Sequence, residues 1–344
     1  MNVHRRQNSK RKGEDASKFV NAQLADFAGD LYLLCKDQHG CRFLQRQLDA
    51  DDAVVALMIF NEIYLHIVEL MTDPFGNYLI QKLFEKVSGA QRVILVKNAA
   101  PQFIRIALDP HGTRALQKLV ECITTDEESA IVIAALATHI VSLSRDLNGN
   151  HVVQKCLQKL KPADNQFIFD AAATNCIEIA THRHGCCVLQ RCLDNGSPEQ
   201  CKQLSTVVAA HCLQLSLDPF GNYVVQYVLF KGDMESVATI VKAIRSDIVN
   251  LSLHKFGSNV IEKSLRSDNG FIPRQLIEEL LEHKQDMSKM LHDAFGNYVL
   301  QTSLDVCNKE DFDKLSAILK PLLPNVRNTP HGRRISARIQ NVLA

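Results

Sequence analysis

The 344-residue sequence predicts an all-α solenoid of eight helical repeats. Three observations predict this class: one seven-residue block recurs, its copies keep an almost constant spacing, and long apolar patterns separate them. Counted at the last residue of each copy, the steps are 36, 36, 37, 36, 36, 36 and 39 residues. The copies are HGCRFLQ (39–45), FGNYLIQ (75–81), HGTRALQ (111–117), NGNHVVQ (148–154), HGCCVLQ (184–190), FGNYVVQ (220–226), FGSNVIE (256–262) and FGNYVLQ (295–301).

Each repeat is expected to hold two long helices and a short connector. The segments 53–71 and 91–108 are too long and too rich in leucine and isoleucine for strands, so they predict helices. An aspartate three residues before the block glycine predicts a turn that leads into a helix N-terminus. Six copies have it: Asp37, Asp73, Asp109, Asp146, Asp218 and Asp293. Because such units cannot bury their apolar faces alone, we expect one cooperative array.

The two ends of the chain differ from the repeats. Residues 1–17 are polar and basic, which predicts a disordered tail, and residues 18–344 are expected to form one repeat domain. The segment 19–35 has an apolar face and predicts an N-terminal cap on the first repeat. After Gln301 come a helical segment with Pro321 and Pro324 and a degraded ninth block (331–337). Since Ala337 replaces the usual glutamine, this block should cap the array.

Composition restricts the location and the partners. No apolar run approaches the roughly 20 residues needed to span a bilayer, and no signal peptide opens the chain, so no membrane is expected. The 11 cysteines form no CxxC pair, which fits a reducing compartment and predicts a cytoplasmic protein. The net charge is +1, so a nucleic-acid partner would require positive charge gathered on one face.

The five residues after each block glycine, numbered one to five, predict two different surfaces. Positions three and four are nearly always apolar and should face the core, as in Phe43-Leu44, Leu79-Ile80, Val152-Val153 and Val260-Ile261. Positions one, two and five share a helix face, so stacked repeats should align them into a polar stripe. We call positions one and five of a repeat its reading pair. The pairs are Cys41 with Gln45, Asn77 with Gln81, Thr113 with Gln117, Asn150 with Gln154, Cys186 with Gln190, Asn222 with Gln226, Ser258 with Glu262, and Asn297 with Gln301.

The chemistry of the stripe suits single-stranded bases. A side-chain amide offers a donor and an acceptor, which match adenine or uracil, whereas a carboxylate matches the adjacent donors of guanine. At position one, asparagine can reach a pyrimidine O2, and a small residue leaves room for a purine. Position two is mostly a flat group, and stacking contributes roughly 1–3 kcal/mol per base. The position-two residues are Arg42, Tyr78, Arg114, His151, Cys187, Tyr223, Asn259 and Tyr298.

A basic residue follows position five in six repeats and predicts a phosphate rail with salt-sensitive RNA affinity. The rail residues are Arg46, Lys82, Lys118, Lys155, Arg191 and Lys263, and the exceptions are Tyr227 and Thr302.

The period and the triplets resemble the Pumilio (PUF) family over about residues 18–344. DQHGCRFLQ, MTDPFGNYLIQK, NGNHVVQK, HKFGSNVIEK and FGNYVLQ look like family repeats at their ordinal positions, and CKDQHGCRFLQ and THRHGCCVLQRCLD look most like the yeast branch. The resemblance implies a right-handed superhelical crescent that binds RNA antiparallel. It also implies binding to mRNA 3′-UTRs, repression or decay of the mRNA, and deadenylase-complex partners on the outer face, near the longer 7–8 connection (268–273). We expect a monomer without a cofactor.

Under this reading, repeats eight to one specify 5′-UGUAUAUA-3′. At repeat five, Cys187 replaces a flat stacking group, so we expect looser geometry in the middle of the site. A nine-base site with an extra, unread base in the 3′ half is therefore a second possibility.

Three alternatives compete with RNA reading. A protein-binding scaffold of the armadillo or HEAT kind shares the architecture but has no reason to vary Asn/Gln against Ser/Glu. A sequence-independent RNA binder should have degraded triplets. His182, His184, Cys186 and Cys187 could suggest zinc, but adjacent cysteines on a helix diverge by about 100°. No nucleophile–base arrangement or phosphate loop appears, so no enzyme is expected.

Overall fold

A computed structural model describes residues 16–341, which form helices joined by short turns, with no strand in that range. The predicted all-α class is confirmed. By its internal contacts the chain divides into two compact units, Met1–Ile168 and Phe169–Ala344, and each is a stack of repeats. The first 15 residues of the predicted disordered tail lie outside the described residues.

Each repeat contains a short helix, a helix that carries the block, and a long helix. The short helices are α2 (Leu31–Cys35), α5 (Ile67–Met71), α8 (Phe103–Leu108), α11 (Ile140–Arg145), α14 (Cys176–Ala180), α17 (Cys212–Ser216), α20 (Ile248–Ser252) and α23 (Met287–His292). The block helices are α3 (Gln38–Asp49), α6 (Gly76–Lys86), α9 (Gly112–Cys122), α12 (Gly149–Lys159), α15 (Gly185–Asn195), α18 (Gly221–Lys231), α21 (Gly257–Leu265) and α24 (Gly296–Val306). The long helices are α4 (Ala53–Ile63), α7 (Gly89–Ala99), α10 (Asp126–Leu136), α13 (Gln166–Thr174), α16 (Pro198–Ala210), α19 (Met234–Ser246), α22 (Phe271–Glu282) and α25 (Lys309–Leu319).

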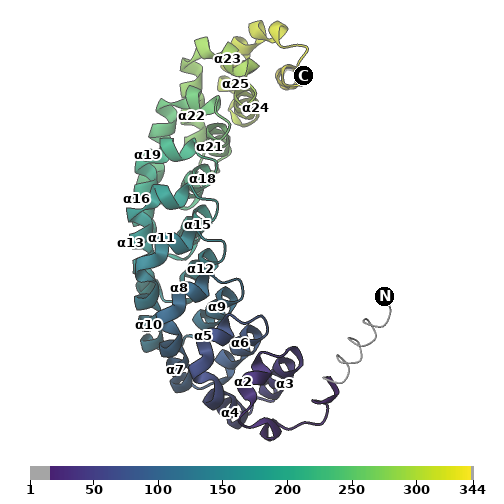
Figure 1. The fold of residues 1–344 in the computed structure, drawn as a ribbon. Coiled ribbons are helices and arrows are strands. Elements are labelled where there is room, and N and C mark those ends of the chain that lie inside the picture. Colours follow the sequence, from purple (N-terminus) through teal and green to yellow (C-terminus); the bar gives the residue numbers. More distant parts are fainter. Residues whose placement is uncertain (1–15, 342–344) are drawn as a thin grey trace, which may run out of the picture. The chain divides into compact units, whose positions relative to one another are not determined.

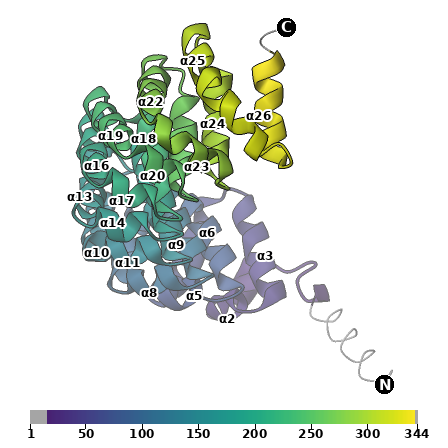
Figure 2. The ribbon, with the colours of Figure 1, turned by 90° about the horizontal axis from the view of Figure 1, so that it is seen from above.

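Within each unit the block helices stack in one row. In the first unit α3, α6, α9 and α12 contact one another in order, and in the second unit α15, α18, α21, α24 and the terminal helix α26 (Pro330–Asn341) do the same (Figure 1). The long helices α16, α19, α22 and α25 form a second row. Figure 2 shows the short helices α17, α20 and α23 beside these two rows. The stacking places the same block position of successive repeats side by side.

The predicted helices over 53–71 and 91–108 are not continuous. The first is α4, a 3-10 turn η2 (Tyr64–His66) and α5, and the second is part of α7, η3 (Ala100–Gln102) and α8. At the first break the Tyr64 carbonyl accepts a hydrogen bond at 3.0 Å from Asn98 Nδ2, which belongs to the next repeat. At the second break Pro101 has no N–H to donate. The other 3-10 turns are η1 (Leu24–Phe27), η4 (Ala137–His139), η5 (Pro162–Asn165), η6 (Lys284–Asp286) and η7 (Lys320–Asn325).

Two apolar stretches correct the expectation about length. Ala53–Met71 and Asp126–Arg145 are long and apolar enough, by length and composition alone, to cross a membrane, so the expectation that no run approaches that length was wrong. In the structure a 3-10 turn breaks each stretch. Ile59, Ile63 and Ile67 are fully buried, so this apolar face belongs to the solenoid core.

The predicted turn before each block helix is confirmed. Asp73 Oδ1 accepts hydrogen bonds from the N–H groups of Phe75 and Gly76 at 2.8 and 2.7 Å. The other five aspartates accept the corresponding pair of bonds. The block glycine is required by close approach: a Cβ at residue 112 would lie 2.5 Å from the carbonyl oxygen of Ile106.

Histidines replace the aspartate in repeats five and seven, which sequence reasoning missed. His182 Nδ1 accepts from the His184 N–H at 3.1 Å. His254 Nδ1 accepts from the N–H groups of Phe256 and Gly257 at 3.1 and 3.2 Å. Both rings must therefore carry an unprotonated Nδ1, and they perform the capping role of the missing carboxylates.

His254→Ala is expected to lower the free energy of unfolding by about 1 kcal/mol, because two N–H groups lose their acceptor. His254→Asp should retain most of the stability, since aspartate caps this turn in six other repeats. Urea denaturation of both variants checks this, with His211→Ala, at an exposed histidine of the same unit, as the control. Equal stability of His254→Ala and the parent chain would contradict the role.

Both predicted caps pack on their neighbouring repeats. Phe19 stacks on Phe43 with ring centroids 5.2 Å apart, and Phe27 meets the same ring edge-on at 5.5 Å. The C-terminal helix α26 carries the degraded ninth block and contacts α24. Part of the predicted N-terminal cap, α2, is the short helix of the first repeat.

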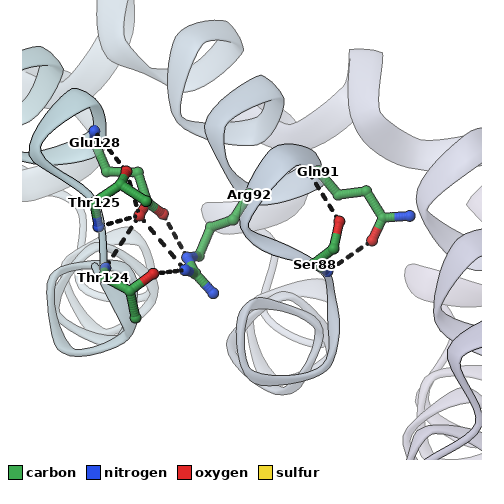
Figure 3. Close-up of polar contacts among 6 residues, drawn as sticks. All are labelled: Ser88, Gln91, Arg92, Thr124, Thr125 and Glu128. Carbon is green, nitrogen blue, oxygen red and sulfur yellow. Dashed lines mark hydrogen bonds and ion pairs between the residues drawn. The ribbon is translucent and has the colours of Figure 1, made fainter.

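A buried ion pair joins successive long helices of the first unit (Figure 3). Arg92 Nε on α7 donates to Glu128 Oε1 on α10 at 2.5 Å, and Arg92 Nη2 donates to Thr124 Oγ1 at 2.7 Å. Glu128 Oε2 accepts from the Thr124 N–H, the Thr125 N–H and the Thr125 hydroxyl at 2.9–3.0 Å. Burial raises the pKa of Glu128, but the hydrogen bonds from Arg92, Thr124 and Thr125 outweigh it and leave the pKa below its usual value.

Candidate nucleic-acid interface

The reading positions have the same burial in every repeat except at position five of repeat eight. Position one is buried in all eight block helices, position two is exposed in all eight, and position five is half-buried except at Gln301, which is 5% exposed. The apolar pairs predicted at positions three and four are buried as expected. Within each unit, the position-one side chains therefore lie beneath the surface, and the position-five side chains beside them are, except for Gln301, partly accessible to a ligand.

In four repeats the asparagine of the reading pair holds its glutamine. In repeat two, Asn77 Nδ2 donates to the carbonyls of Asp73 and Pro74 at 2.8 and 3.1 Å, and its Oδ1 accepts from Gln81 Nε2 at 3.1 Å. The asparagines of repeats four, six and eight make the same two bonds to turn carbonyls. Their Oδ1 atoms accept from Gln154, Gln226 and Gln301 at 2.9, 3.0 and 2.9 Å respectively.

These bonds correct the expected role of position one. Both N–H groups of each asparagine are already engaged, so donation to a pyrimidine O2 requires one of these bonds to be shared or opened. The glutamine is held before any base arrives. Since the bond to asparagine uses one N–H of the amide, Gln154 and Gln226 each keep a second N–H donor and the Oε1 acceptor for a base edge.

Where position one is small, its side chain bonds to a turn carbonyl. Cys41 Sγ donates to the Phe75 carbonyl at 3.0 Å and accepts from Gln45 Nε2 at 3.2 Å. Thr113 Oγ1 likewise donates to the Asn148 carbonyl at 2.9 Å and accepts from Gln117 Nε2 at 3.3 Å. These shorter side chains keep the amide of position five oriented in repeats one and three.

Repeat five departs from this pattern. Cys186 Sγ donates to the Arg183 carbonyl of its own turn, at 3.5 Å, and does not accept from the amide of position five. Within residues 16–341, the side chain of Gln190 makes no hydrogen bond, although it is half-buried like every other position-five glutamine except Gln301. The orientation of Gln190 is therefore not set by a hydrogen bond before binding. In repeat seven Ser258 also bonds within its own turn.

Position two presents flat side chains to solvent. Tyr78, Tyr223 and Tyr298 are 47%, 52% and 46% exposed. Arg42, Arg114, His151 and Asn259 are also exposed. Cys187 is exposed too, so repeat five has a thiol where the other repeats have a larger group. Stacking on bases stays a prediction for all eight positions.

Half of the predicted phosphate rail is paired with carboxylates of the preceding repeat. Lys82 pairs with Asp49 at 2.5 Å, Lys118 pairs with Glu85, and Lys155 pairs with Glu121 at 2.5 Å. Sequence reasoning missed these acids, although they form a column nine residues after the block glycine: Asp49, Glu85, Glu121, Asp194 and Asp305. We call the contacts between the residue after position five and this column the inter-repeat ladder.

The rest of the rail differs. Arg191 pairs with Asp194 on its own helix, at 3.4 Å. Arg46 and Lys263 are exposed and have no ion pair among residues 16–341. The positive charge beside the reading pairs is therefore less free than the sequence suggested, and a phosphate-binding role stays a prediction.

The reading groups of repeats seven and eight are held by the block that follows each of them. Thr302 Oγ1 donates to Glu262 Oε1 at 2.7 Å, and Arg266 Nη2 donates to Thr302 Oγ1 at 3.1 Å. Arg338 Nη1 of the ninth block donates to Gln301 Oε1 at 2.9 Å. Its Nε donates to Asp305 at 2.7 Å, which is a further ladder contact. An alignment of the repeats would have indicated this contact. Thr302 lies where six repeats have a basic residue, and Arg266 lies where five repeats have an acidic one.

The residues considered for zinc do not form a site. In the described part of the chain no three His, Cys, Asp or Glu residues are placed to hold a metal ion. His182 accepts a backbone N–H, and burial raises the pKa of the Cys186 thiol above its usual value. These residues serve the turn and the reading pair of repeat five.

Comparison with known proteins matches all eight repeats. The model of the Pumilio-family RNA binding repeat matches residues 30–64, 66–98, 102–137, 139–171, 175–208, 211–245, 247–281 and 291–319. The Pumilio domain-containing protein C6G9.14 of Schizosaccharomyces pombe is 44% identical over 319 residues, covering 93% of this chain and 47% of the relative. A second protein of that yeast, C4G8.03c, is 45% identical over 92% of this chain and 40% of its own length. The chain thus spans less than half of the length of these two relatives.

Solved structures agree. The Puf4 RNA-binding domain bound to the HO endonuclease RNA 3′-UTR recognition sequence matches with a TM-score of 0.85 and 54% identity, over 89% of this chain and 97% of that one. The RNA-binding domain of yeast Puf5p bound to SMX2 RNA matches with a TM-score of 0.80 and 32% identity, over 91% and 96%. Eight matched repeats and these relatives show that the chain belongs to the Pumilio family of RNA-binding repeat proteins.

Proposed function

We propose that this chain binds single-stranded RNA in a sequence-specific way, with one base per repeat. The observation that carries this proposal is the set of eight reading pairs, which occupy the same place on successive block helices and include one carboxylate, Glu262. Side-chain hydrogen bonds orient the position-five group before binding in every repeat except the fifth, which lowers the ordering cost of recognition. Solved relatives bound to RNA 3′-UTR sequences support the same function.

The proposed site is 5′-UGUAUAUA-3′, with repeat eight on the first base. The four pairs of asparagine with glutamine would read uracil: Asn297 with Gln301, Asn222 with Gln226, Asn150 with Gln154, and Asn77 with Gln81. The three pairs of a small residue with glutamine would read adenine: Cys186 with Gln190, Thr113 with Gln117, and Cys41 with Gln45. Ser258 with Glu262 would read guanine through its two adjacent donors.

Fluorescence anisotropy with this octamer and its single-base variants tests the proposal. Replacing the guanine by uracil should weaken binding by roughly 10-fold or more, because one well-formed bidentate contact is worth about 1–3 kcal/mol of discrimination. Affinity should fall as salt rises, since exposed Arg46 and Lys263 can meet phosphates. Equal affinity for every variant would contradict base reading, and a protein-binding scaffold would then be the better assignment.

Cys187 is expected to control the length of the site. Because a thiol cannot stack as a flat group does, the parent chain should accept a nine-base site with one extra base in the 3′ half. Cys187→Tyr, which copies Tyr78 and Tyr223, should favour the eight-base site by about five- to tenfold relative to the nine-base site, as one stacking contact is restored. Competition titrations of both RNAs give the ratio. An unchanged ratio would show that the gap at repeat five does not set the length.

We further propose that the bound RNA lies in mRNA 3′-UTRs and that binding represses the transcripts or leads to their decay. The 3′-UTR sequences bound by solved relatives support the first part. For the cell, we propose a cytoplasmic monomer that is not an enzyme and needs no cofactor. Its proposed protein partners belong to the deadenylase complex. A reporter mRNA with the octamer in its 3′-UTR should be less abundant or less translated than one with the guanine replaced.

A further inference from the structure

The residue after position five of one repeat lies beside the reading residue of the preceding repeat. Lys82 shows this geometry, since its Nζ lies 3.4 Å from the Gln45 carbonyl while it pairs with Asp49. In repeats two, three, four and six this residue contacts the ladder acid of the preceding repeat. Tyr227, for example, donates its hydroxyl to Asp194 at 2.5 Å.

Repeats seven and eight depart from this arrangement. Arg266 stands where five other repeats have the ladder acid, and Thr302 stands where six repeats have lysine or arginine. At this junction the cation, Arg266, lies at the end of the helix that carries Glu262, and the following repeat contributes the hydroxyl of Thr302 in place of a cation. Thr302 is only 2% exposed, and its hydroxyl donates to Glu262 Oε1 and accepts from Arg266.

The contact suits carboxylate readout. A carboxylate has about four lone-pair positions, so the single bond from Thr302 leaves acceptors for two adjacent guanine donors. Among residues 16–341 Glu262 has no ion pair, because Arg266 is engaged with the hydroxyl instead. The carboxylate is thereby oriented without being neutralised by a direct partner.

We propose that Thr302 is a specificity-determining positioning residue for the base read by repeat seven: it fixes one oxygen of Glu262 and links that carboxylate to Arg266. The assignment rests on the proposed function, and it adds to the reading pair a residue 40 positions further along the chain. Arg338, which holds Gln301 from the ninth block, shows that the same place orients a second reading residue.

The test compares Thr302→Val with Thr302→Ser, using octamers that carry guanine or adenine at the second base. Removing the hydroxyl should lower the guanine-to-adenine affinity ratio roughly fivefold or more, because a hydrogen bond to a charged group is lost. Serine keeps the hydroxyl and should stay within about twofold of the parent ratio. Arg266→Met should lower the ratio in the same direction, and its effect should not add to that of Thr302→Val.

Tyr227→Phe is the matched control. It also removes a hydroxyl after position five, but that hydroxyl contacts only the ladder carboxylate of Asp194, and the reading pair of repeat five should be unaffected. Discrimination at the fourth base should therefore not change. Thermal denaturation of each variant shows whether it is folded.

The outcomes separate the inference from the proposed function. If the parent chain shows no preference for guanine, base reading itself fails. If the parent prefers guanine and Thr302→Val weakens all octamers equally, Thr302 has only a structural role and the inference is overturned. A lower ratio in Thr302→Val, restored in Thr302→Ser, supports it.

Discussion

Ser258→Asn combined with Glu262→Gln is expected to change the preferred second base from guanine to uracil. The new asparagine can donate to the carbonyls of His254 and Lys255, as Asn77 does to those of its own turn, and can accept from the new glutamine. Repeat seven would then hold the same oriented amide as its neighbours. The guanine octamer should lose roughly 10- to 100-fold in affinity, and the uracil octamer should become the preferred ligand.

Anisotropy titrations with all four bases at the second position measure this change. The third base, assigned to Asn222 and Gln226, is the internal control and should keep its uracil preference. Loss of binding without a new preference, in a variant that remains folded, would contradict one-base-per-repeat reading.

Glu128→Ala is expected to be the most destabilising single substitution considered, at about 3–5 kcal/mol of unfolding free energy. The change leaves the guanidinium of Arg92, which is 6% exposed, without its carboxylate partner. Glu127→Ala on the same helix is the control: its ion pair with Lys97 is more than half exposed, so removal should cost at most about 1 kcal/mol. Urea denaturation compares the two variants.

Replacing the whole ion pair separates the effect of the unpaired charge from that of the hydrogen bonds that Glu128 accepts. Arg92→Met with Glu128→Leu should be more stable than Glu128→Ala, because no unpaired charge stays buried. If the double variant is no more stable, the loss of the carboxylate that accepts from Thr124 and Thr125, rather than the orphaned charge, explains the effect.

The same pair predicts a dependence on pH. The folded-state pKa of Glu128 lies below the ordinary value of 4.5, so its contribution to stability is present above that pH and is lost as pH falls through the lower folded-state value. The loss of stability on acidification should therefore be smaller in Glu128→Ala than in the parent chain.

Features that depend on local sequence were predictable. The block period located every block helix, the apolar pairs such as Leu79-Ile80 are buried, and the six aspartates cap their turns. The break at Tyr64 could not be predicted from the local sequence, because the side chain that donates a hydrogen bond to the Tyr64 carbonyl, Asn98, belongs to the next repeat. The two capping histidines, in contrast, could have been predicted from the sequence. They occupy the position of the aspartate, and an imidazole nitrogen can also accept a backbone N–H.

The site was predictable in composition but not in connectivity. Which residues form reading pairs followed from helix periodicity, whereas the partners of Lys82 and Glu262 depend on which repeat edges become neighbours. Periodicity also could not distinguish Gln154, which its asparagine holds, from Gln190, which no side chain holds in the described part of the chain. Aligning the columns of all repeats would have shown the ladder acids as a second period.

The inter-repeat ladder also limits how repeats can be recombined. A repeat such as the second, with Lys82 and Glu85, carries one half of a ladder contact at each edge, and after a move each half must meet a suitable partner. Repeat eight placed after repeat two would bring Thr302 against Glu85, which now pairs with Lys118, and would leave that carboxylate without a cation. Grafting only positions one, two and five into an existing repeat avoids this mismatch. Designed chimeras of this protein should therefore exchange reading residues and leave repeat boundaries intact.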